Sequence, residues 1–369
     1  MLLRRAKSFS TNLSISQWKS LPYSRKASRF RDSDDDEDRN ARKRKAREGG
    51  GDESRIYLHK SRGQHILTNP RILHSIVQRA DVRPTDTVLE IGPGTGNLTL
   101  KLLESAQKVF AVEIDKRMVE ILHTRVADRQ LDDRLTVICK DALKTQFPEF
   151  DLCVANIPYG ISSPLIVKLL FGGYTFRSAT LLLQKEFARR LLANPGDSAF
   201  NRLAVNVKLV ATVEFVMDVS KKDFIPCPKV DSSVVRIQPK SAIPNVDLDE
   251  WRAFTRTCFG NKNRTLGAIL KQKRKVMELL RVSQSGGREN DNDDNEDNED
   301  GDGDEDEDGI DDEEEGGDLM EMAFFKEKIL GVLKENGYEE KRPSKLSVEE
   351  LLHLLSLFNQ VGVHFHGCK

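Results

Sequence analysis

The segment Asn156-Ile157-Pro158-Tyr159 could present an amino group for methyl transfer. The exocyclic amine of adenine is a poor nucleophile because its lone pair is delocalised into the ring. The Asn156 side-chain oxygen and the Ile157 backbone carbonyl could accept its N–H bonds and direct the lone pair at a sulfonium methyl. Pro158 would stiffen the turn, and stacking of the base on Tyr159 would contribute about 1–3 kcal/mol. The alternative interpretation is an ordinary Asn-x-Pro turn.

A glycine-rich turn is the candidate site for the methyl donor. The segment Glu90-Ile91-Gly92-Pro93-Gly94-Thr95-Gly96-Asn97 follows a predicted strand and opens a predicted helix. Its glycines, Gly92, Gly94 and Gly96, allow a tight turn and let a ligand lie directly on the backbone. Dinucleotide-binding proteins and plain turns share this pattern, but the turn lacks the GxGxxG spacing of a pyrophosphate loop. The spacing therefore favours S-adenosylmethionine.

Two acidic residues at the ends of the next two strands support this cofactor. Glu113 ends the second predicted strand, where its carboxylate could accept both ribose hydroxyls of an adenosine. Asp141 follows the third strand, where it could accept from the adenine amine. Each acid alone could be a helix cap or a surface residue, but ends of parallel strands meet at the crevice where such sheets bind ligands. This chemistry needs no metal, and we expect none.

Strand-like and helical patterns alternate from about residue 55 to residue 240. The predicted strands are Thr87–Ile91, Val109–Ile114, Leu135–Cys139, Leu152–Ala155, Thr180–Leu183, Val213–Val219 and Val234–Ile237. The predicted helices are Pro70–Ala80, Leu98–Ser105, Lys116–Ala127, Pro164–Leu170, Glu186–Leu192 and Arg202–Val210. This alternation predicts an α/β fold with a mainly parallel, Rossmann-like methyltransferase sheet. The last two strands lack an intervening helix, which predicts an antiparallel hairpin at one edge.

The residues after Pro239 are expected to form a small α-helical domain. The predicted helices are Trp251–Phe259, Thr265–Leu270, Lys275–Leu280, Phe324–Leu333 and Val348–Phe358. We therefore expect a targeting and disordered segment at 1–54, a methyltransferase domain at 55–240 and a helical RNA-binding domain at 241–369. The last contains a disordered acidic insertion at 284–318, which could compete with RNA or serve as a solvated spacer.

The net charge of −1 hides a strong asymmetry. Between Glu289 and Asp318 there are 20 Asp or Glu and no Lys or Arg; the remaining chain has 58 basic and 39 acidic residues. A body this basic suits nucleic acid, although a merely soluble basic surface is the alternative. The five cysteines contain no CxxC pair and are typical of reduced thiols in an intracellular protein. No run approaches the roughly 18 apolar residues that span a bilayer, so we expect no membrane contact.

The two ends of the chain leave alternatives open. Residues 1–30 contain seven Lys or Arg, seven Ser and no Asp or Glu, which is typical of a mitochondrial transit peptide. The basic cluster at 42–47 could be a nuclear localisation signal, an RNA-binding arm or a solvated linker. We expect a mitochondrial location, with the nucleolus as the alternative. His364-Phe365-His366-Gly367-Cys368 lacks a fourth metal ligand and is expected to be a structural or frayed tail.

Four segments in this order resemble the ribosomal RNA adenine N6,N6-dimethyltransferases, which include archaeal and eukaryotic enzymes acting on small-subunit rRNA. The segments are Ser61-Arg62-Gly63-Gln64-His65-Ile66-Leu67, Glu90–Gly96, Asn156–Tyr159 with Ile161-Ser162-Ser163-Pro164, and Phe224-Ile225-Pro226-Cys227-Pro228-Lys229-Val230-Asp231-Ser232. The likeness runs from about Lys60 to Leu270 and resumes near the C-terminus. It implies that His65 and Leu67 line the cofactor pocket beside Gly92, Glu113, Asp141 and Asn156.

The resemblance also implies the substrate. Members of the family transfer two methyls to each of two adjacent adenosines in a 3′-terminal hairpin loop of small-subunit rRNA, and a single-stranded loop suits this because unstacking a base there costs little. It implies that Phe224 closes the other face of the target base, opposite Tyr159, and that Lys229 meets RNA phosphate. We expect a monomer that acts on rRNA within a pre-ribosomal particle during ribosome biogenesis.

The chain departs from the family pattern at three places. Cys227 stands where a proline is common, Ile66 stands where Phe is usual, and the acidic insertion puts the RNA contacts of the helical domain in doubt. Three alternative functions remain: a methyltransferase for DNA adenine or protein glutamine, a non-catalytic ribosome-assembly or mitochondrial transcription factor, and a cytosolic or nucleolar rRNA dimethyltransferase. Asn156, Glu113 and Asp141 are all present, which favours catalysis.

Overall fold

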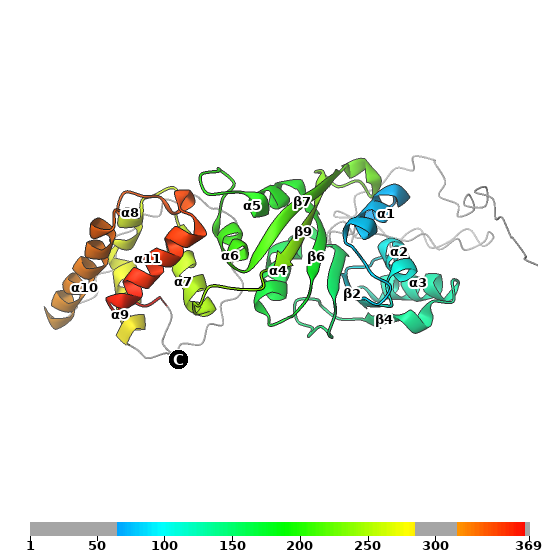
Figure 1. Ribbon diagram of the computed structural model, residues 1–369, viewed down its shortest axis with the longest axis horizontal. Helices are drawn as coiled ribbons and strands as arrows, with labels where there is room; N and C mark the ends of the chain where they lie inside the picture. Colours follow the sequence, from blue (N-terminus) through cyan, green and yellow to red (C-terminus); the bar gives the residue numbers. More distant parts are fainter. Residues whose placement is uncertain (1–64, 285–315, 366–369) are drawn as a thin grey trace, which may run out of the picture. The chain divides into compact units, whose positions relative to one another are not determined.

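The computed structural model describes residues 65–284 and 316–365 (Figure 1). The predicted targeting segment, the basic cluster at 42–47 and residues 61–64 of the first motif lie outside the described residues. So do most of the predicted acidic insertion and His366 and Cys368 of the C-terminal cluster.

A seven-stranded sheet forms the centre of residues 65–240, in the order β4-β3-β2-β5-β6-β9-β7. Its strands are β2 (Thr87–Ile91), β3 (Lys108–Val112), β4 (Leu135–Ile138), β5 (Leu152–Asn156), β6 (Ser178–Gln184), β7 (Ala211–Val219) and β9 (Ser232–Pro239). The strands from β4 to β6 in this order are parallel, and β9 runs antiparallel to both β6 and β7. The predicted α/β fold and the antiparallel pair are therefore confirmed. The strand β9 lies inside the sheet, so β7 alone forms that edge.

The two faces of the sheet bury separate hydrophobic clusters because successive side chains of a strand point to opposite faces. In β2, Val88 belongs to the cluster of α1, α2 and α3, whereas Leu89 belongs to that of α4, α5 and α6. These helices are α1 (Pro70–Arg79), α2 (Asn97–Ser105), α3 (Lys116–Ala127), α4 (Ser162–Phe171), α5 (Lys185–Leu192) and α6 (Arg202–Val210). Side chains of Asn69, Asp115 and Asn201 cap α1, α3 and α6, which fixes where these helices begin.

A second, two-stranded sheet joins segments that lie about 160 residues apart in the chain. It pairs β1 (Ile66–Leu67) with β8 (Phe224–Ile225), and Leu67 lies opposite Phe224. This ribbon was not predicted, because strands of two residues show no alternation of polar and apolar side chains. It brings the first and fourth motifs of the sequence together. Short 3-10 turns complete this region at η3 (Asp132–Arg134), η4 (Tyr159–Ile161) and η5 (Lys221–Asp223).

The C-terminal part is helical, as predicted. It contains α7 (Leu248–Phe259), α8 (Leu266–Leu270), α9 (Lys273–Gln284), α10 (Gly316–Glu335), η6 (Pro343–Lys345) and α11 (Val348–Gln360). One hydrophobic cluster continues from α6 into these helices and includes the fully buried Trp251 and Phe254. A buried hydrogen bond of 2.9 Å from the Thr255 hydroxyl to the Asn206 side chain also crosses this junction. Within the described ranges, no helix is long and apolar enough to cross a membrane.

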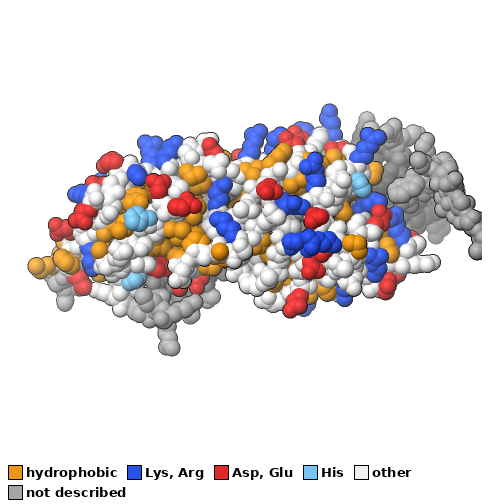
Figure 2. Space-filling model, viewed as in Figure 1, with side chains coloured by type: hydrophobic (Ala, Val, Ile, Leu, Met, Phe, Trp, Pro, Cys, Tyr) orange, Lys and Arg blue, Asp and Glu red, His pale blue; other side chains and the backbone are white. Residues whose placement is uncertain are grey.

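Lys and Arg side chains occur over both the sheet region and the C-terminal helices. On the face drawn in Figure 2 they are interspersed with Asp, Glu and apolar side chains, so this face presents no continuous basic stripe. The predicted excess of positive charge outside the acidic run is thus spread over the surface on this side. The distribution of charge on this face therefore does not indicate where RNA binds.

Candidate active site

The residues of all three cofactor motifs gather at the carboxyl ends of the parallel strands. The glycine turn follows β2, Glu113 follows β3, and Asp141 lies three residues after β4. Asn156 is the last residue of β5, the neighbour of β2 on the other side. The chain leaves β2 towards β3 but returns at β5, so the strand order reverses here, and such a switch point is where open α/β sheets bind ligands.

The glycine turn has the backbone conformation that its sequence indicated. Gly92, Gly94 and Gly96 have φ angles of +67°, +55° and +84°, in the left-handed region that favours glycine. A Cβ atom on Gly92 would lie 3.2 Å from the Pro158 ring, so the turn and the Asn156–Tyr159 motif pack directly against each other. A Cβ on Gly94 would meet no atom of residues 65–284 or 316–365 within 4 Å. The turn is therefore closed towards the motif and open on the side of Gly94, where a ligand can lie against it.

Glu113 is a nearly buried carboxylate, 8% exposed, and is fixed by two backbone amides. Its Oε2 accepts from Gly94 N at 3.1 Å and its Oε1 from Asp115 N at 2.9 Å. Burial raises the pKa of Glu113 above its usual range, and these hydrogen bonds oppose the rise. Each carboxylate oxygen can accept more than one hydrogen bond, so the group retains capacity for two ribose hydroxyls.

Ile114 is a candidate pocket residue that the sequence motifs did not indicate. It lies between the buried Glu113 and Asp115, yet it is 62% exposed. Its side chain offers an apolar surface beside the candidate ribose acceptor, which suits the face of a purine ring. The signal that could have found it is an isoleucine between two acids at the end of a strand, where it cannot join the core.

Asp141 begins a tight turn after β4. Its Oδ1 accepts from Leu143 N at 2.9 Å, and its backbone carbonyl accepts from the Thr145 hydroxyl at 2.7 Å. Among the described residues, nothing donates to Oδ2, which is left as an acceptor for an amine. The glycine turn, Glu113 and Asp141 together fit S-adenosylmethionine, since they supply an open backbone cradle, a ribose acceptor and an adenine acceptor.

The side-chain amide of Asn156 has a defined orientation. Its Nδ2 donates to the carbonyl of His65 at 3.1 Å, which leaves its Oδ1 as the acceptor that the chemistry requires. The Tyr159 hydroxyl shares a 2.8 Å hydrogen bond with the buried Ser232, and burial raises the pKa of Tyr159. The His65 ring stacks on Tyr159 with centroids 5.9 Å apart, and its Nδ1 lies 2.9 Å from the Pro226 carbonyl. Residues of three of the four motifs thus meet around the Tyr159 ring.

Phe224 lies beside these groups but is 2% exposed. It pairs with Leu67 in the β1–β8 ribbon and belongs to the same buried cluster as Leu67 and Val219. A base can stack on this ring only after the atoms that cover it move aside. Leu67 is also buried, and its backbone carbonyl accepts from the Asn97 side chain at 2.9 Å, which ties the ribbon to the start of α2.

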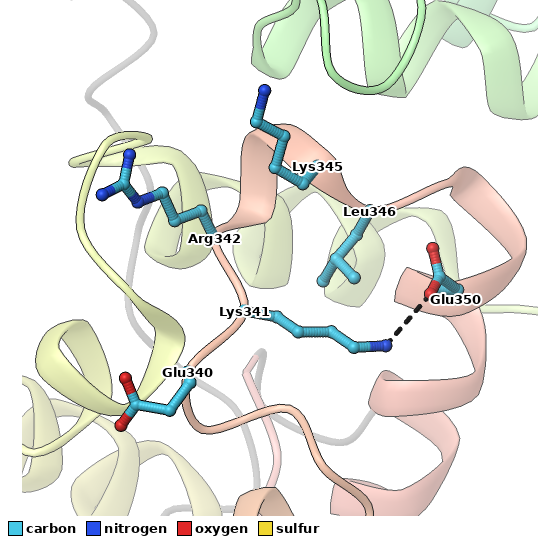
Figure 3. Close-up of a pocket in the computed structure, with 6 residues that line it drawn as sticks. All are labelled: Glu340, Lys341, Arg342, Lys345, Leu346 and Glu350. Carbon is cyan, nitrogen blue, oxygen red and sulfur yellow. Dashed lines mark hydrogen bonds and ion pairs between the residues drawn. The ribbon is translucent and has the colours of Figure 1, made fainter.

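Another hollow lies in the C-terminal helices and is lined by Glu340, Lys341, Arg342, Lys345, Leu346 and Glu350. Lys341 reaches across it to Glu350 at 3.2 Å, whereas Arg342 and Lys345 point away (Figure 3). It contains none of the motif residues, and we assign it no chemistry. His364 pairs with Glu250 at 3.3 Å, and the described residues contain no group of three or more possible metal ligands.

Residues 56–297 match the family model described as ribosomal RNA adenine dimethylase. The chain belongs to this family. It is 64% identical over 316 residues to the "Ribosomal RNA small subunit methyltransferase, mitochondrial" of Arabidopsis thaliana, an alignment that covers 84% of this chain and 81% of that protein. A second Arabidopsis thaliana relative, "Ribosomal RNA small subunit methyltransferase", is 52% identical over 84% of this chain and 93% of its own.

The fold agrees with this family. The crystal structure of a dimethyladenosine transferase from Plasmodium falciparum matches with a TM-score of 0.67 at 39% identity, over 81% of this chain and 99% of that one. The family that the four motifs resembled is therefore confirmed. The chain is an S-adenosylmethionine-dependent rRNA adenine N6,N6-dimethyltransferase, as the four motifs predicted.

Proposed function

We propose that this rRNA dimethyltransferase modifies two adjacent adenosines in the 3′-terminal hairpin loop of small-subunit rRNA and uses Asn156 to present each amine. One observation carries the assignment of Asn156. Its Nδ2 is engaged by the His65 carbonyl at 3.1 Å, so its Oδ1 is oriented as an acceptor next to the glycine turn. An acceptor at this place draws an adenine amine towards the methyl donor.

The donor pocket is proposed to consist of His65, Leu67, Gly92, Gly94, Gly96, Glu113, Asp141 and Asn156. The bound S-adenosylmethionine supplies the electrophilic methyl on its sulfonium. Glu113 would accept the ribose hydroxyls, Asp141 Oδ2 would accept from the adenine amine, and Gly94 would leave room for the ligand on the backbone. These contacts fix the donor before the target amine arrives, which lowers the entropic cost of reaction.

The target amine is proposed to donate one N–H to Asn156 Oδ1 and the other to the Ile157 carbonyl. These bonds favour a pyramidal nitrogen and direct its lone pair at the donor methyl. The first transfer would release one N–H proton to solvent and leave one N–H on the amine, so one acceptor would be enough to hold it for the second. Pro158 keeps the turn against Gly92, and the ring of Tyr159 would stack on the base, with Phe224 on the other face once it is uncovered.

The direct test is Asn156→Ala in the full-length chain. We expect methylation of an rRNA hairpin to fall by about a thousandfold or more, because an acceptor that acts at the reacting nitrogen is lost, while RNA binding persists. Asn336→Ala is the matched control, since its amide also donates to a backbone carbonyl, Val332 O at 2.9 Å, but in the C-terminal helices. Wild-type rates for Asn156→Ala would contradict the mechanism.

We propose the mitochondrion as the place of action and the small-subunit rRNA of its ribosome, within a pre-ribosomal particle, as the substrate. The acid-free residues 1–30 and the name of the 64% identical relative support this, and the nucleolus is the alternative. Dimethyladenosine should be mapped in mitochondrial and cytosolic small-subunit rRNA after depletion of the protein. Loss from cytosolic rRNA alone would overturn the mitochondrial assignment.

We also propose the division of labour along the chain: targeting in residues 1–54, catalysis in 55–240 and RNA binding by the helices of 241–369, in a monomer. The shared hydrophobic cluster and the Thr255–Asn206 bond favour helices that are fixed on the catalytic part. We expect the full-length protein to sediment as a monomer. We also expect its affinity for the hairpin to fall when basic side chains of the C-terminal helices are neutralised.

A further inference from the structure

Lys168 makes an unusual set of hydrogen bonds at the back of the donor pocket. It lies in α4, and its Nζ donates to three backbone carbonyls: Ala142 O at 2.8 Å, Leu143 O at 2.9 Å and Thr145 O at 2.5 Å. An ammonium group has three N–H donors, and here all three are used on carbonyls of a single turn. The same Nζ lies 4.4 Å from the centroid of the Phe147 ring.

The turn gathered by Lys168 is the one that carries Asp141. Leu143 N donates to Asp141 Oδ1 at 2.9 Å, and the Thr145 hydroxyl donates to the Asp141 carbonyl at 2.7 Å. Lys168 therefore holds the carbonyls of the two residues whose donor groups fix Asp141. Burial lowers the pKa of Lys168, and the charge of Asp141 opposes this. The cation replaces the water that would otherwise solvate three carbonyls facing each other.

The position of Lys168 in the chain connects the two sides of the site. The helix α4 begins at Ser162, three residues after Tyr159, so the element that follows the amine-presenting motif also holds the adenine-binding turn. A shift of this helix would move the Asp141 turn with it. Lys168 thus links this helix to three backbone carbonyls of the turn.

We propose that Lys168 is a positioning residue that sets the affinity and the specificity of the pocket for the adenine of the methyl donor, acting through Asp141. The inference rests on the proposed role of Asp141 as acceptor of the adenine amine. Lys168 touches neither donor nor base. It fixes the turn so that Asp141 Oδ2 stays aimed at the place where that amine would lie.

The experiment measures the Kd of S-adenosylhomocysteine by titration calorimetry on the full-length chain. Lys168→Met should weaken binding on the order of tenfold, because the turn loses three charge-assisted hydrogen bonds and Asp141 Oδ2 is then held less well in place. Lys168→Arg, which keeps a charged donor, should restore part of the affinity. Lys275→Met is the matched control, since Lys275 pairs with the nearby Glu278 at 2.7 Å in the C-terminal helices, and the Kd of this variant should equal that of the wild type.

A second ligand separates specific positioning from general destabilisation. S-inosylhomocysteine has an oxygen in place of the adenine amine. It therefore has no amine N–H to donate to Asp141. Lys168→Met should therefore reduce the preference for the adenosyl over the inosyl ligand about tenfold. Equal weakening for both ligands would mean that Lys168 only stabilises the fold, and the proposal would be wrong. If Lys168→Met does not fold, the same ratio is measured on Lys168→Gln, which keeps a neutral donor and should still lose part of the preference.

A double-mutant cycle with Asp141→Asn distinguishes failure of this inference from failure of the proposed function. The asparagine keeps an oxygen for Leu143 N but places an amide donor against the adenine amine. If Asp141→Asn leaves the Kd unchanged, the proposed role of Asp141 fails. If it weakens binding, the two substitutions should be non-additive, because Lys168 acts through Asp141. Additive effects would overturn the role of Lys168 alone.

Discussion

The two halves of the active site are held in different ways. The donor half, which comprises the Gly92–Gly96 turn, Glu113 and Asp141, lies on the ends of three neighbouring strands and is fixed by backbone hydrogen bonds. The base half comprises Asn156–Tyr159 and Phe224, and it depends on a ribbon of two residues per strand. The donor half has open acceptors, whereas Phe224 is 2% exposed. For the function proposed above, the donor half is therefore prepared before binding, and the base half would have to rearrange to accept a flipped nucleotide.

The largest expected effect on donor binding lies in the donor half. Glu113→Ala should weaken S-adenosylhomocysteine binding about a hundredfold, because two hydrogen bonds to a charged acceptor are lost at about 1.5 kcal/mol or more each. Binding of an rRNA hairpin should not change. Calorimetry and a filter-binding assay measure the two affinities, with Glu120→Ala on the exposed face of α3 as control. An equal loss of RNA affinity would mean that the halves are not independent.

In the base half, Tyr159→Ala should reduce methylation of the hairpin by about tenfold or more while the Kd of S-adenosylhomocysteine stays the same. The reason is the loss of base stacking, worth about 1–3 kcal/mol. Tyr159→Phe keeps the ring and removes only the 2.8 Å bond to Ser232, so its rate should lie within a few-fold of the wild type. A large loss of donor affinity in Tyr159→Ala would break the comparison between the halves.

Much of the donor half could be predicted from the sequence, because each of its residues stands at the end of a strand with a clear pattern. Glu113 and Asp141 follow the parallel strands β3 and β4, and parallel strand ends meet at one edge. In the base half, the role of Asn156–Tyr159 was predicted from its own chemistry, whereas that of Phe224 came only from the resemblance. The ribbon pairs residues about 160 positions apart, and neither its pairing nor the burial of Phe224 leaves a local signal. The hydrogen bonds from Lys168 to a turn more than 20 residues away likewise leave no local signal in the sequence.

Asn97 connects the two halves, and its removal should affect both by a few-fold. Its Nδ2 donates to the Leu67 carbonyl of the ribbon at 2.9 Å, and its Oδ1 accepts from Arg125 at 2.8 Å. Arg125 also donates to the Thr95 carbonyl in the glycine turn. Asn97→Ala breaks this connection, so the Kd of S-adenosylhomocysteine and the KM for the hairpin should both rise about three- to tenfold. A change in only one of them would show that the ribbon and the turn are positioned separately.

Substitution of Glu90 should have the smallest effect on methylation. Its expected effect is on the pH dependence of the free energy of unfolding. Glu90 is 1% exposed, and burial raises its pKa to about 8. Between the ordinary glutamate pKa of about 4.3 and pH 8 the folded chain holds a proton that the unfolded chain releases, so the free energy of unfolding falls as the pH rises. Glu90→Gln removes this titration.

The free energy of unfolding, measured with urea, should therefore fall less steeply with pH in Glu90→Gln than in the wild type. The difference in slope should reach up to about 1.4 kcal/mol per pH unit between pH 5 and pH 8. The exposed Glu104→Gln on α2 serves as the control and should keep the wild-type slope. If Glu90→Gln follows the wild-type curve instead, Glu90 is ionised in the folded chain despite its burial. The donor half would then owe part of its order to a buried charge beneath the glycine turn.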